Sequence, residues 1–505
     1  MKGAASLSCG VRLLALAAAL AVAATAVLTG GAHAARPMLV GFQDDPGFRW
    51  SPDRRAIIAD AARAHATIIR ATANWWQIAP VRPANAADPF DPAYRFVDLD
   101  ELIRSAAMDG ITVMLTIWGT PSWANGGRPP NSAPDSMADL YAFTRAVADR
   151  YSGRHPGFPF VGYYTIWNEP NSALFLAPAY DDAGRPVSPY VYARICRAAY
   201  AGLKGSNPLA RVAIGQTASR GREHGGEGAD SIAPGIFARL LAQVTPAVPF
   251  DAWAHHPYSD LGFGPLQRYR FPNVDLATLH TFEQRLDRWF RRPDIPIWIT
   301  EYGFETRPWR TGGVTVAQQA AYVRQSLAIA AADPRVQMFI WFVLRDDPAM
   351  STWDSGLIAE TGAPKPGLAA FAGAAAPLDA RDPVVQVPGG TAWPVLRIPV
   401  WELAIRNGVG GRIGSVISVY SGGRRIGVGT PQARITVDGY AVFRLPIRRV
   451  RAGADYRGYV QDINDIHGNR ISRTALVVGV PGLDRPDPAG VGRYDFSRRR
   501  VGEGR

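Results

Sequence analysis

Short apolar runs alternate with longer amphipathic stretches from residue 38 to residue 371, and the alternation repeats eight times. The short runs are rich in β-branched and aromatic residues, which is typical of buried strands. They predict strands at 38–42, 66–71, 111–118, 160–167, 212–216, 251–255, 295–300 and 337–343. The longer stretches repeat their apolar residues with the helical period. They predict helices at 52–64, 99–108, 136–151, 190–203, 232–243, 276–290, 315–331 and 365–372.

Two α/β folds share this alternation, the open doubly wound sheet and the closed (β/α)8 TIM barrel. The open sheet normally carries a glycine-rich phosphate turn after its first strand. Residues Gly41–Asp45, where the first predicted strand ends, do not form such a turn. The sequence therefore predicts a (β/α)8 TIM barrel, which would occupy residues 35–372.

The pattern changes after the barrel. An Ala/Pro-rich linker at 373–382 is followed by residues 383–480, which lack the helical period. Their short apolar runs are joined by turns such as Asp438-Gly439, which predicts a small all-β sandwich. Its expected strands are 395–403, 415–420, 433–437, 441–445, 459–462 and 475–480. Gln461-Asp462 followed by Gly468-Asn469 resembles the final hairpin of bacterial Ig-like modules.

The two ends of the chain differ in composition from the rest. Residues 1–34 predict a signal peptide, because Lys2 and Arg12 precede an apolar run and Ala32-His33-Ala34 supplies a cleavage site. An uncleaved membrane anchor is the alternative. We expect a secreted or extracytoplasmic protein of the cell envelope. Residues 481–505 are rich in Pro, Gly and Arg, and they predict a basic disordered tail.

The formal charge of +12 raises the question of an anionic partner. Only three of the 55 basic residues are lysines, and the arginines are scattered, so no nucleic-acid surface is predicted. The cluster Arg498–Arg500 lies in the tail, where it is suited to contact an anionic cell envelope. We expect a monomer that needs no metal or cofactor and has no transmembrane partner.

Two glutamates stand where predicted barrel strands end. Glu169 follows the fourth strand, within Trp167–Pro170, and Glu301 follows the seventh. Reacting residues of a TIM barrel lie at the C-terminal strand ends, so we expect these carboxyls to face each other across the mouth. For a single glutamate, a helix cap or a surface ion pair is the alternative. Two at opposed strand exits favour glycoside chemistry, in which retaining enzymes place their carboxyls about 5 to 5.5 Å apart.

The run Trp167-Asn168-Glu169-Pro170 resembles the Asn-Glu-Pro signature of glycoside hydrolase clan A, particularly families 5 and 39. The resemblance extends over residues 38–371. It implies a retaining mechanism in which Glu169 is the catalytic acid/base and Glu301 is the nucleophile. It also implies that Asn168 binds the sugar 2-hydroxyl and that Arg70, on the second strand, holds the nucleophile.

The resemblance assigns further substrate-binding residues to other strand exits. His256 and Tyr258 would shape the subsite and support the nucleophile, although the adjacent His255 is an alternative inward-facing histidine. Trp341 would form the floor of the sugar subsite, with barrel core as its structural alternative. Trp118 and Trp123 are suited to stack on sugar rings or, alternatively, to fill the core.

The sequence thus predicts a secreted retaining glycoside hydrolase that acts by double displacement on β-linked bonds of a poly- or oligosaccharide. A non-catalytic glycan-binding protein of the cell envelope is one alternative, and a transglycosylase with the same two glutamates is another. The loop at 217–228, which carries Arg220 and His224, belongs either to the substrate cleft or to a surface excursion. The sugar, and endo or exo action, do not follow from fold-level analogy.

Overall fold

The computed structural model describes residues 38–378 except 110, 154, 156–157, 209, 307–311 and 348–352. Beyond residue 378 it describes only strands between 393 and 495. The predicted signal peptide lies outside the described residues. Every helix among the described residues is too short or too polar to cross a bilayer.

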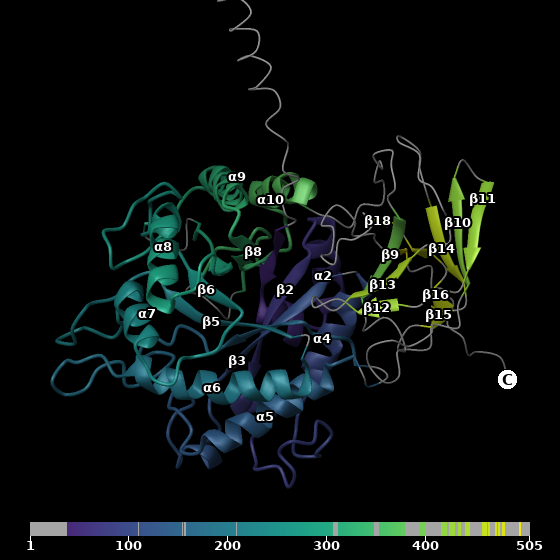
Figure 1. Cartoon of the computed structure of the whole chain (residues 1–505). Coiled ribbons are helices and arrows are strands. Elements are labelled where there is room, and N and C mark those ends of the chain that lie inside the picture. Colours follow the sequence, from purple (N-terminus) through teal and green to yellow (C-terminus); the bar gives the residue numbers. More distant parts are fainter. Residues whose placement is uncertain are drawn as a thin grey trace, which may run out of the picture. The chain divides into compact units, whose positions relative to one another are not determined.

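Eight parallel strands form a closed barrel in which each strand pairs with the next and β8 pairs with β1 (Figure 1). The strands are β1 (Leu39–Gln43), β2 (Ile68–Asn74), β3 (Thr112–Trp118), β4 (Tyr163–Ile166), β5 (Arg211–Ala218), β6 (Ala252–His256), β7 (Ile297–Tyr302) and β8 (Val336–Phe342). Each overlaps one predicted strand, and the closure of the sheet confirms the barrel over the open doubly wound alternative.

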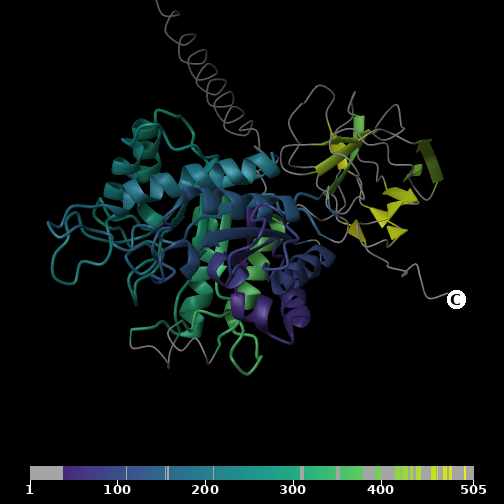
Figure 2. The same ribbon diagram turned by 90° about the horizontal axis from the view of Figure 1, so that it is seen from below.

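A layer of helices surrounds the strands (Figure 2). The main helices are α2 (Arg54–Arg63), α4 (Val97–Met108), α5 (Met137–Arg150), α6 (Ser188–Ser206), α7 (Pro234–Ala242), α8 (Leu279–Phe290), α9 (Val316–Ala332) and α10 (Pro366–Ala375). Short helical turns that the sequence pattern did not predict are η1 (Pro46–Trp50), α3 (Trp75–Ile78) and η2 (Ser122–Ala124).

The predicted linker begins too early. Helix α10 continues to Ala375, and a 3-10 turn, η5 (Ala376–Leu378), follows it, so helical structure enters the segment 373–382. Alanine has the highest helix propensity, and the alanine-rich run therefore extends the last helix of the barrel where composition suggested a linker.

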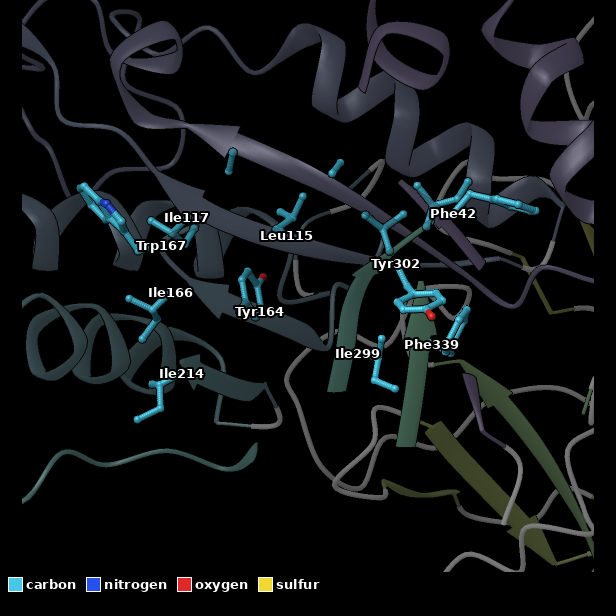
Figure 3. Packing of buried hydrophobic residues seen from close by; sticks show 14 of the residues in the cluster. Phe42, Leu115, Ile117, Tyr164, Ile166, Trp167, Ile214, Ile299, Tyr302 and Phe339 are labelled. Atoms are coloured by element: carbon cyan, nitrogen blue, oxygen red, sulfur yellow. The ribbon is translucent and has the colours of Figure 1, made fainter. Parts of the chain in front are cut away.

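Side chains on alternate positions of each strand pack into two separate cores. One lies inside the barrel and includes Met338 and Ile340 of β8 together with Trp298 of β7. The other lies between the strands and the helices and includes Phe339 and Trp341 of the same β8 strand. Figure 3 shows part of this second core, with Phe339 and Tyr302 from neighbouring strands close together. Because side chains alternate along a strand, the next position, Phe342, faces the barrel interior.

The C-terminal strands pair antiparallel. The order in one sheet is β11-β10-β14, and in a second it is β12-β13-β9-β18. Their bounds are β9 (Trp393–Pro399), β10 (Val416–Ser421), β11 (Arg424–Gly429), β12 (Ala433–Ile435), β13 (Tyr440–Arg444), β14 (Arg457–Gln461) and β18 (Val477–Gly479). All except β11 overlap a predicted strand. Within the predicted disordered tail, β19 (Tyr494–Asp495) pairs with β17 (Arg473–Thr474), which the composition of the tail did not indicate.

Candidate active site

Glu169 sits just past the end of β4 on a strained piece of backbone. The φ angles of Trp167 and Glu169 are 65° and 35°, in the left-handed region that residues other than glycine rarely adopt. Surrounding bonds hold this conformation, since the Trp167 indole donates to Phe175 O (2.6 Å) and the Glu169 amide donates to Gln216 O (3.1 Å). Strain of this kind persists where the surrounding structure enforces it, and it concentrates at functional sites.

Glu301 lies within β7 and is buried. The guanidinium of Arg70 forms an ion pair with its Oε1, and the hydroxyl of Tyr258 donates to its Oε2 at 3.2 Å. Burial raises the pKa of this carboxyl, but the charges of His256 and Arg70 and the bonds from Arg70 and Tyr258 outweigh burial and hold the pKa below its ordinary value. The site therefore keeps Glu301 ionised.

Arg70 is 1% exposed and organises the floor of the site from β2. Besides Glu301 it contacts the side chain of Gln43, and it donates to Asn168 Oδ1 (2.7 Å). Asn168 Oδ1 also accepts from Gln216 Nε2 at 2.9 Å. Its carbonyl oxygen is thus occupied by two donors, which fixes the amide and orients its NH2 group for another acceptor.

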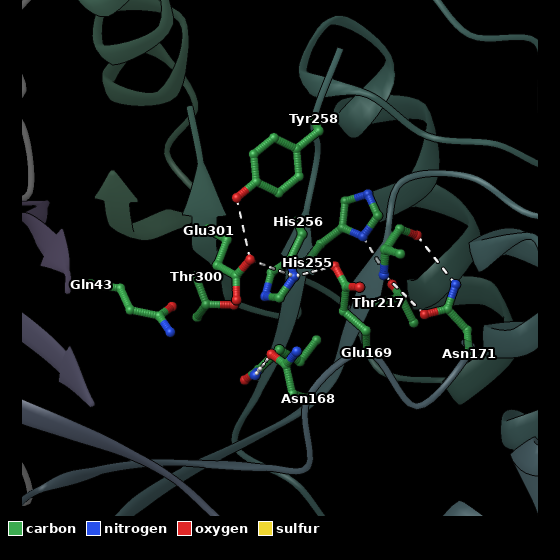
Figure 4. A network of polar contacts seen from close by, with 12 residues as sticks. Gln43, Asn168, Glu169, Asn171, Thr217, His255, His256, Tyr258, Thr300 and Glu301 are labelled. Atoms are coloured by element: carbon green, nitrogen blue, oxygen red, sulfur yellow. Dashed lines mark hydrogen bonds and ion pairs between the residues drawn. The ribbon is translucent and has the colours of Figure 1, made fainter. Parts of the chain in front are cut away.

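The two adjacent histidines have different surroundings (Figure 4). Nδ1 of His256 lies 2.8 Å from Glu169 Oε1 and 3.5 Å from Glu301 Oε2. His255 instead contacts Thr217 Oγ1 at 2.9 Å and Val274 O at 3.1 Å. Burial lowers the pKa of His255 to about 3, so this ring is neutral and structural. His256 is the histidine that faces the two glutamates.

Glu169, His256 and Glu301, hereafter the mouth trio, come from β4, β6 and β7. One oxygen of each carboxylate and a nitrogen of His256 all lie within 4.8 Å of one another. Such a trio has the residue types of a metal site. Here, however, Arg70 already supplies a fixed positive charge to Glu301, and the arrangement leaves two carboxyls close together with different partners.

Trp118 and Trp123 are only partly buried, and their indole nitrogens are already bonded. Trp118 Nε1 donates to Phe175 O at 3.2 Å, and Trp123 Nε1 donates to Ala79 O at 2.7 Å. The guanidinium of Arg82 lies 4.3 Å from the centre of the Trp123 ring. One face of Trp123 is therefore covered, and the ring of Trp118 lies 6.0 Å from that of Phe175 in an edge-on arrangement.

Trp341 does not form a floor of the mouth, contrary to the resemblance. It is fully buried in the core between strands and helices, and its Nε1 donates to Ser355 O at 2.9 Å. The period-two alternation of β8 turns it outward and turns the partly exposed Phe342 inward. The ring of Phe342 lies 5.6 Å from that of Trp353, which is 38% exposed and lies 5.7 Å from the ring of Tyr258.

The loop at 217–228 is tied to its neighbours through polar contacts away from the mouth trio. Arg220 pairs with Asp260, and Arg222 Nη1 donates to Glu227 O at 3.0 Å. Within the described part of the chain, no group of potential metal ligands includes His224. Asp260 is two residues from Tyr258, so these contacts do not separate the surface-excursion alternative from the cleft alternative.

Four side chains at or beside the site were not predicted: Gln43, Gln216, Phe342 and Trp353. Gln43 ends β1 and contacts Arg70, while Gln216 lies near the end of β5 and bonds Asn168. Gln43 and Gln216 are polar residues at the ends of predicted strands, and the same signal identified Glu301. The period-two alternation of β8 was also available in the sequence, and it separates Phe342 from Trp341.

Comparison with known proteins adds independent information. Residues 266–371 match the family model described as the glycosyl hydrolase catalytic core. A glucosidase from Croceicoccus marinus is 15% identical, with a TM-score of 0.51, over 82% of this chain and 96% of that one. GH5_18 from Streptomyces cattleya, in complex with GlcNAc, is 17% identical, with a TM-score of 0.50, over 69% and 82%. No curated protein sequence matches the chain.

At 15% and 17% sequence identity, the similarity to these two structures shows a shared fold and nothing more specific. The family match is the more specific finding, because residues 266–371 contain β7 and therefore Glu301. Together with the two carboxyls that His256 brings together, it supports a glycoside hydrolase as the interpretation of the barrel.

Proposed function

We propose that the barrel is a retaining glycoside hydrolase in which Glu301 is the nucleophile and Glu169 is the acid/base. The observation that carries the proposal is the placement of both carboxyls around His256, with oxygens within 4.8 Å of one another. Retaining enzymes have carboxyls about 5 to 5.5 Å apart, whereas inverting enzymes need roughly 6.5 to 9.5 Å to admit a water molecule.

The different partners of the two glutamates suit different steps. Arg70 and Tyr258 keep Glu301 ionised, so its oxygen attacks the anomeric carbon while the glycosidic C–O bond breaks. Glu169 donates its proton to the departing oxygen. In the second step Glu169 takes a proton from water, the water oxygen bonds to the anomeric carbon, and the bond to Glu301 breaks. His256, within 3.5 Å of both carboxyls, positions them.

The substrate in this proposal is a β-linked poly- or oligosaccharide. Asn168, whose amide is fixed by Arg70 and Gln216, is oriented to meet a sugar hydroxyl. Phe342 and Trp353 supply partly exposed rings beside the site, and aromatic rings are suited to pack against sugar rings.

The test is hydrolysis of a panel of aryl β-glycosides and polysaccharides by the wild-type protein and by Glu169→Gln, Glu301→Gln and Glu283→Gln. Glu283 is also a buried glutamate but lies on α8, so its variant is the matched control. We expect kcat/KM to fall by at least roughly 1,000-fold in Glu301→Gln and to stay within twofold in the control. Retention is checked by following the anomer first released by NMR.

Three outcomes would contradict parts of the proposal. Glycan binding without turnover in the wild type indicates a binding protein. Release of the inverted anomer removes the nucleophile assignment. Sugar transfer to an added acceptor in preference to water indicates a transglycosylase with the same residues.

We also propose that residues 1–34 direct export and are removed, and that residues 383–480 form an Ig-like module. The apolar run and the Ala32–Ala34 site support the first point. The second point is supported by the two antiparallel sheets, β11-β10-β14 and β12-β13-β9-β18. N-terminal sequencing of protein recovered from culture medium tests the first, because a start at Met1 contradicts cleavage.

A further inference from the structure

A second group of two carboxyls and a histidine lies outside the mouth, on the helical layer. His280 and Glu283 are one turn apart on α8, and Asp333 follows the last residue of α9. One ligand atom of each lies within 4.8 Å of the other two. These three residues are hereafter the helix trio.

Glu283 is the unusual member. Its side chain is 0% exposed, and among the described residues the only side-chain hydrogen-bond partner of its carboxyl is the carboxyl of Asp333. A buried carboxylate without an N–H donor is costly. A ligand atom of Asp333 lies within 4.8 Å of one of Glu283. Two carboxyls this close repel each other when both are ionised, and a cation bound between them relieves the repulsion.

The nearby Arg335 does not provide such a cation for Glu283. Arg335 directs two nitrogens to Asp287, at 2.7 and 3.0 Å, and also donates to Ile295 O. Its Nε comes only within 3.8 Å of Glu283 Oε2. The guanidinium therefore pairs directly with Asp287 and lies farther from Glu283.

The distance between His280 and Glu283 fits a transition metal. His280 Nδ1 lies 3.4 Å from Glu283 Oε2. Two ligands at about 2.0 to 2.1 Å from a tetrahedral zinc ion are separated by roughly 3.3 Å, which is close to the observed distance. Gln284 contacts the other ring nitrogen of His280 at 3.0 Å, which leaves Nδ1 directed at the carboxylate. An imidazole and two carboxylates suit Zn²⁺ better than Ca²⁺, which prefers oxygen ligands alone.

We propose that His280, Glu283 and Asp333 bind a divalent transition-metal ion of the Zn²⁺ type, with water completing the coordination. His280 is 71% exposed and so leaves the site open to solvent on one side. The ion joins α8 to the turn between α9 and β8. Its role is to stabilise the packing of these elements.

The test uses the full mature protein stripped with a chelator and titrated with ZnCl2. We expect one Zn²⁺ per chain by calorimetry and a rise in Tm of roughly 2–4 °C under excess metal. His280→Gln and Glu283→Gln should each weaken this binding by at least 10-fold. Because His280 is exposed, its substitution leaves the fold intact and keeps the test decisive.

The mouth trio provides the competing site, so Glu169→Gln is measured in parallel. Zinc binding that disappears in Glu169→Gln and persists in His280→Gln would place the ion in the mouth and overturn the proposal. Absence of stoichiometric binding in the wild type would overturn it as well. An anomalous-scattering peak at the zinc edge between His280 and Asp333 is the direct positive result.

Discussion

The mouth trio and the helix trio have the same composition, two carboxyls and one histidine, and in each the three ligand atoms lie within 4.8 Å of one another. Their central glutamates are both buried. Glu301 receives bonds from Arg70 and Tyr258, and its pKa lies below the ordinary value despite burial. Among the described residues, Glu283 has only the carboxyl of Asp333 as a side-chain hydrogen-bond partner, and burial raises its pKa to about 8.

Residue type and proximity therefore do not decide what such a group does. The dedicated donors decide it, since a carboxylate with an arginine and a tyrosine remains ionised. A carboxylate without them takes up a proton or a cation. Two kinds of substitution test this comparison. One removes hydrogen-bond donors from the mouth trio, and the other removes the charge from the helix trio.

Removing the arginine from the mouth should have the largest effect. Arg70→Met leaves Glu301 buried without its guanidinium and frees Asn168 and Gln43 from their common partner. We expect kcat/KM for an aryl β-glycoside to fall roughly 100- to 1,000-fold. Arg49→Met is the matched control, because Arg49 is equally buried but bonds Asp98 and Thr72 O. Equal loss of activity in two folded variants would contradict a specific role for Arg70.

Removing only the tyrosine hydroxyl should have a smaller effect and should move the pH profile. The bond from Tyr258 lowers the pKa of Glu301, and the proposed mechanism requires Glu301 to be ionised. Tyr258→Phe should therefore shift the acidic limb of kcat/KM to higher pH, with a roughly 10-fold loss in activity. Tyr302→Phe is the control, since its ring stacks on Tyr258 without bonding the nucleophile. An unmoved acidic limb would show that the hydroxyl does not set the charge of Glu301.

The two trios also differ in how far the sequence predicts them. The eight strands follow from apolar periodicity, and the mouth residues follow from the rule that barrel chemistry lies at strand ends. Trp341 was misplaced because a resemblance identifies a residue type at a strand end, whereas the alternation of β8 decides which side the ring faces.

The helix trio was not predicted, for a physical reason. His280 and Glu283 have helical spacing, which also describes an ordinary solvated pair. Asp333 lies some fifty residues later, and only the packing of α8 against the turn before β8 brings it close. Whether a glutamate loses its water depends on tertiary packing, so its missing donors cannot be predicted from local sequence.

A third prediction removes the charge from the helix trio. In the unfolded chain Glu283 loses its proton near pH 4.5, whereas the folded protein keeps it until about pH 8. The folded state thus binds more protons in this window, and stability falls as the pH rises through it. In chelator-treated protein, Glu283→Gln should raise Tm by roughly 2–4 °C at pH 9 and leave it nearly unchanged at pH 4. The exposed Glu101→Gln is the control, and a variant less stable at pH 9 would contradict this account.

The smallest effect is expected from the exposed histidine of the helix trio. Without metal, His280 contributes one long contact to Glu283 and one contact to Gln284. His280→Gln should therefore change Tm by less than about 1 °C and leave kcat/KM unchanged in chelator-treated protein. The same substitution at His256, which is buried and contacts both Glu169 and Glu301, should lower kcat/KM at least roughly 10-fold. Equal effects at both positions would show that burial and hydrogen-bond donors do not distinguish the two trios.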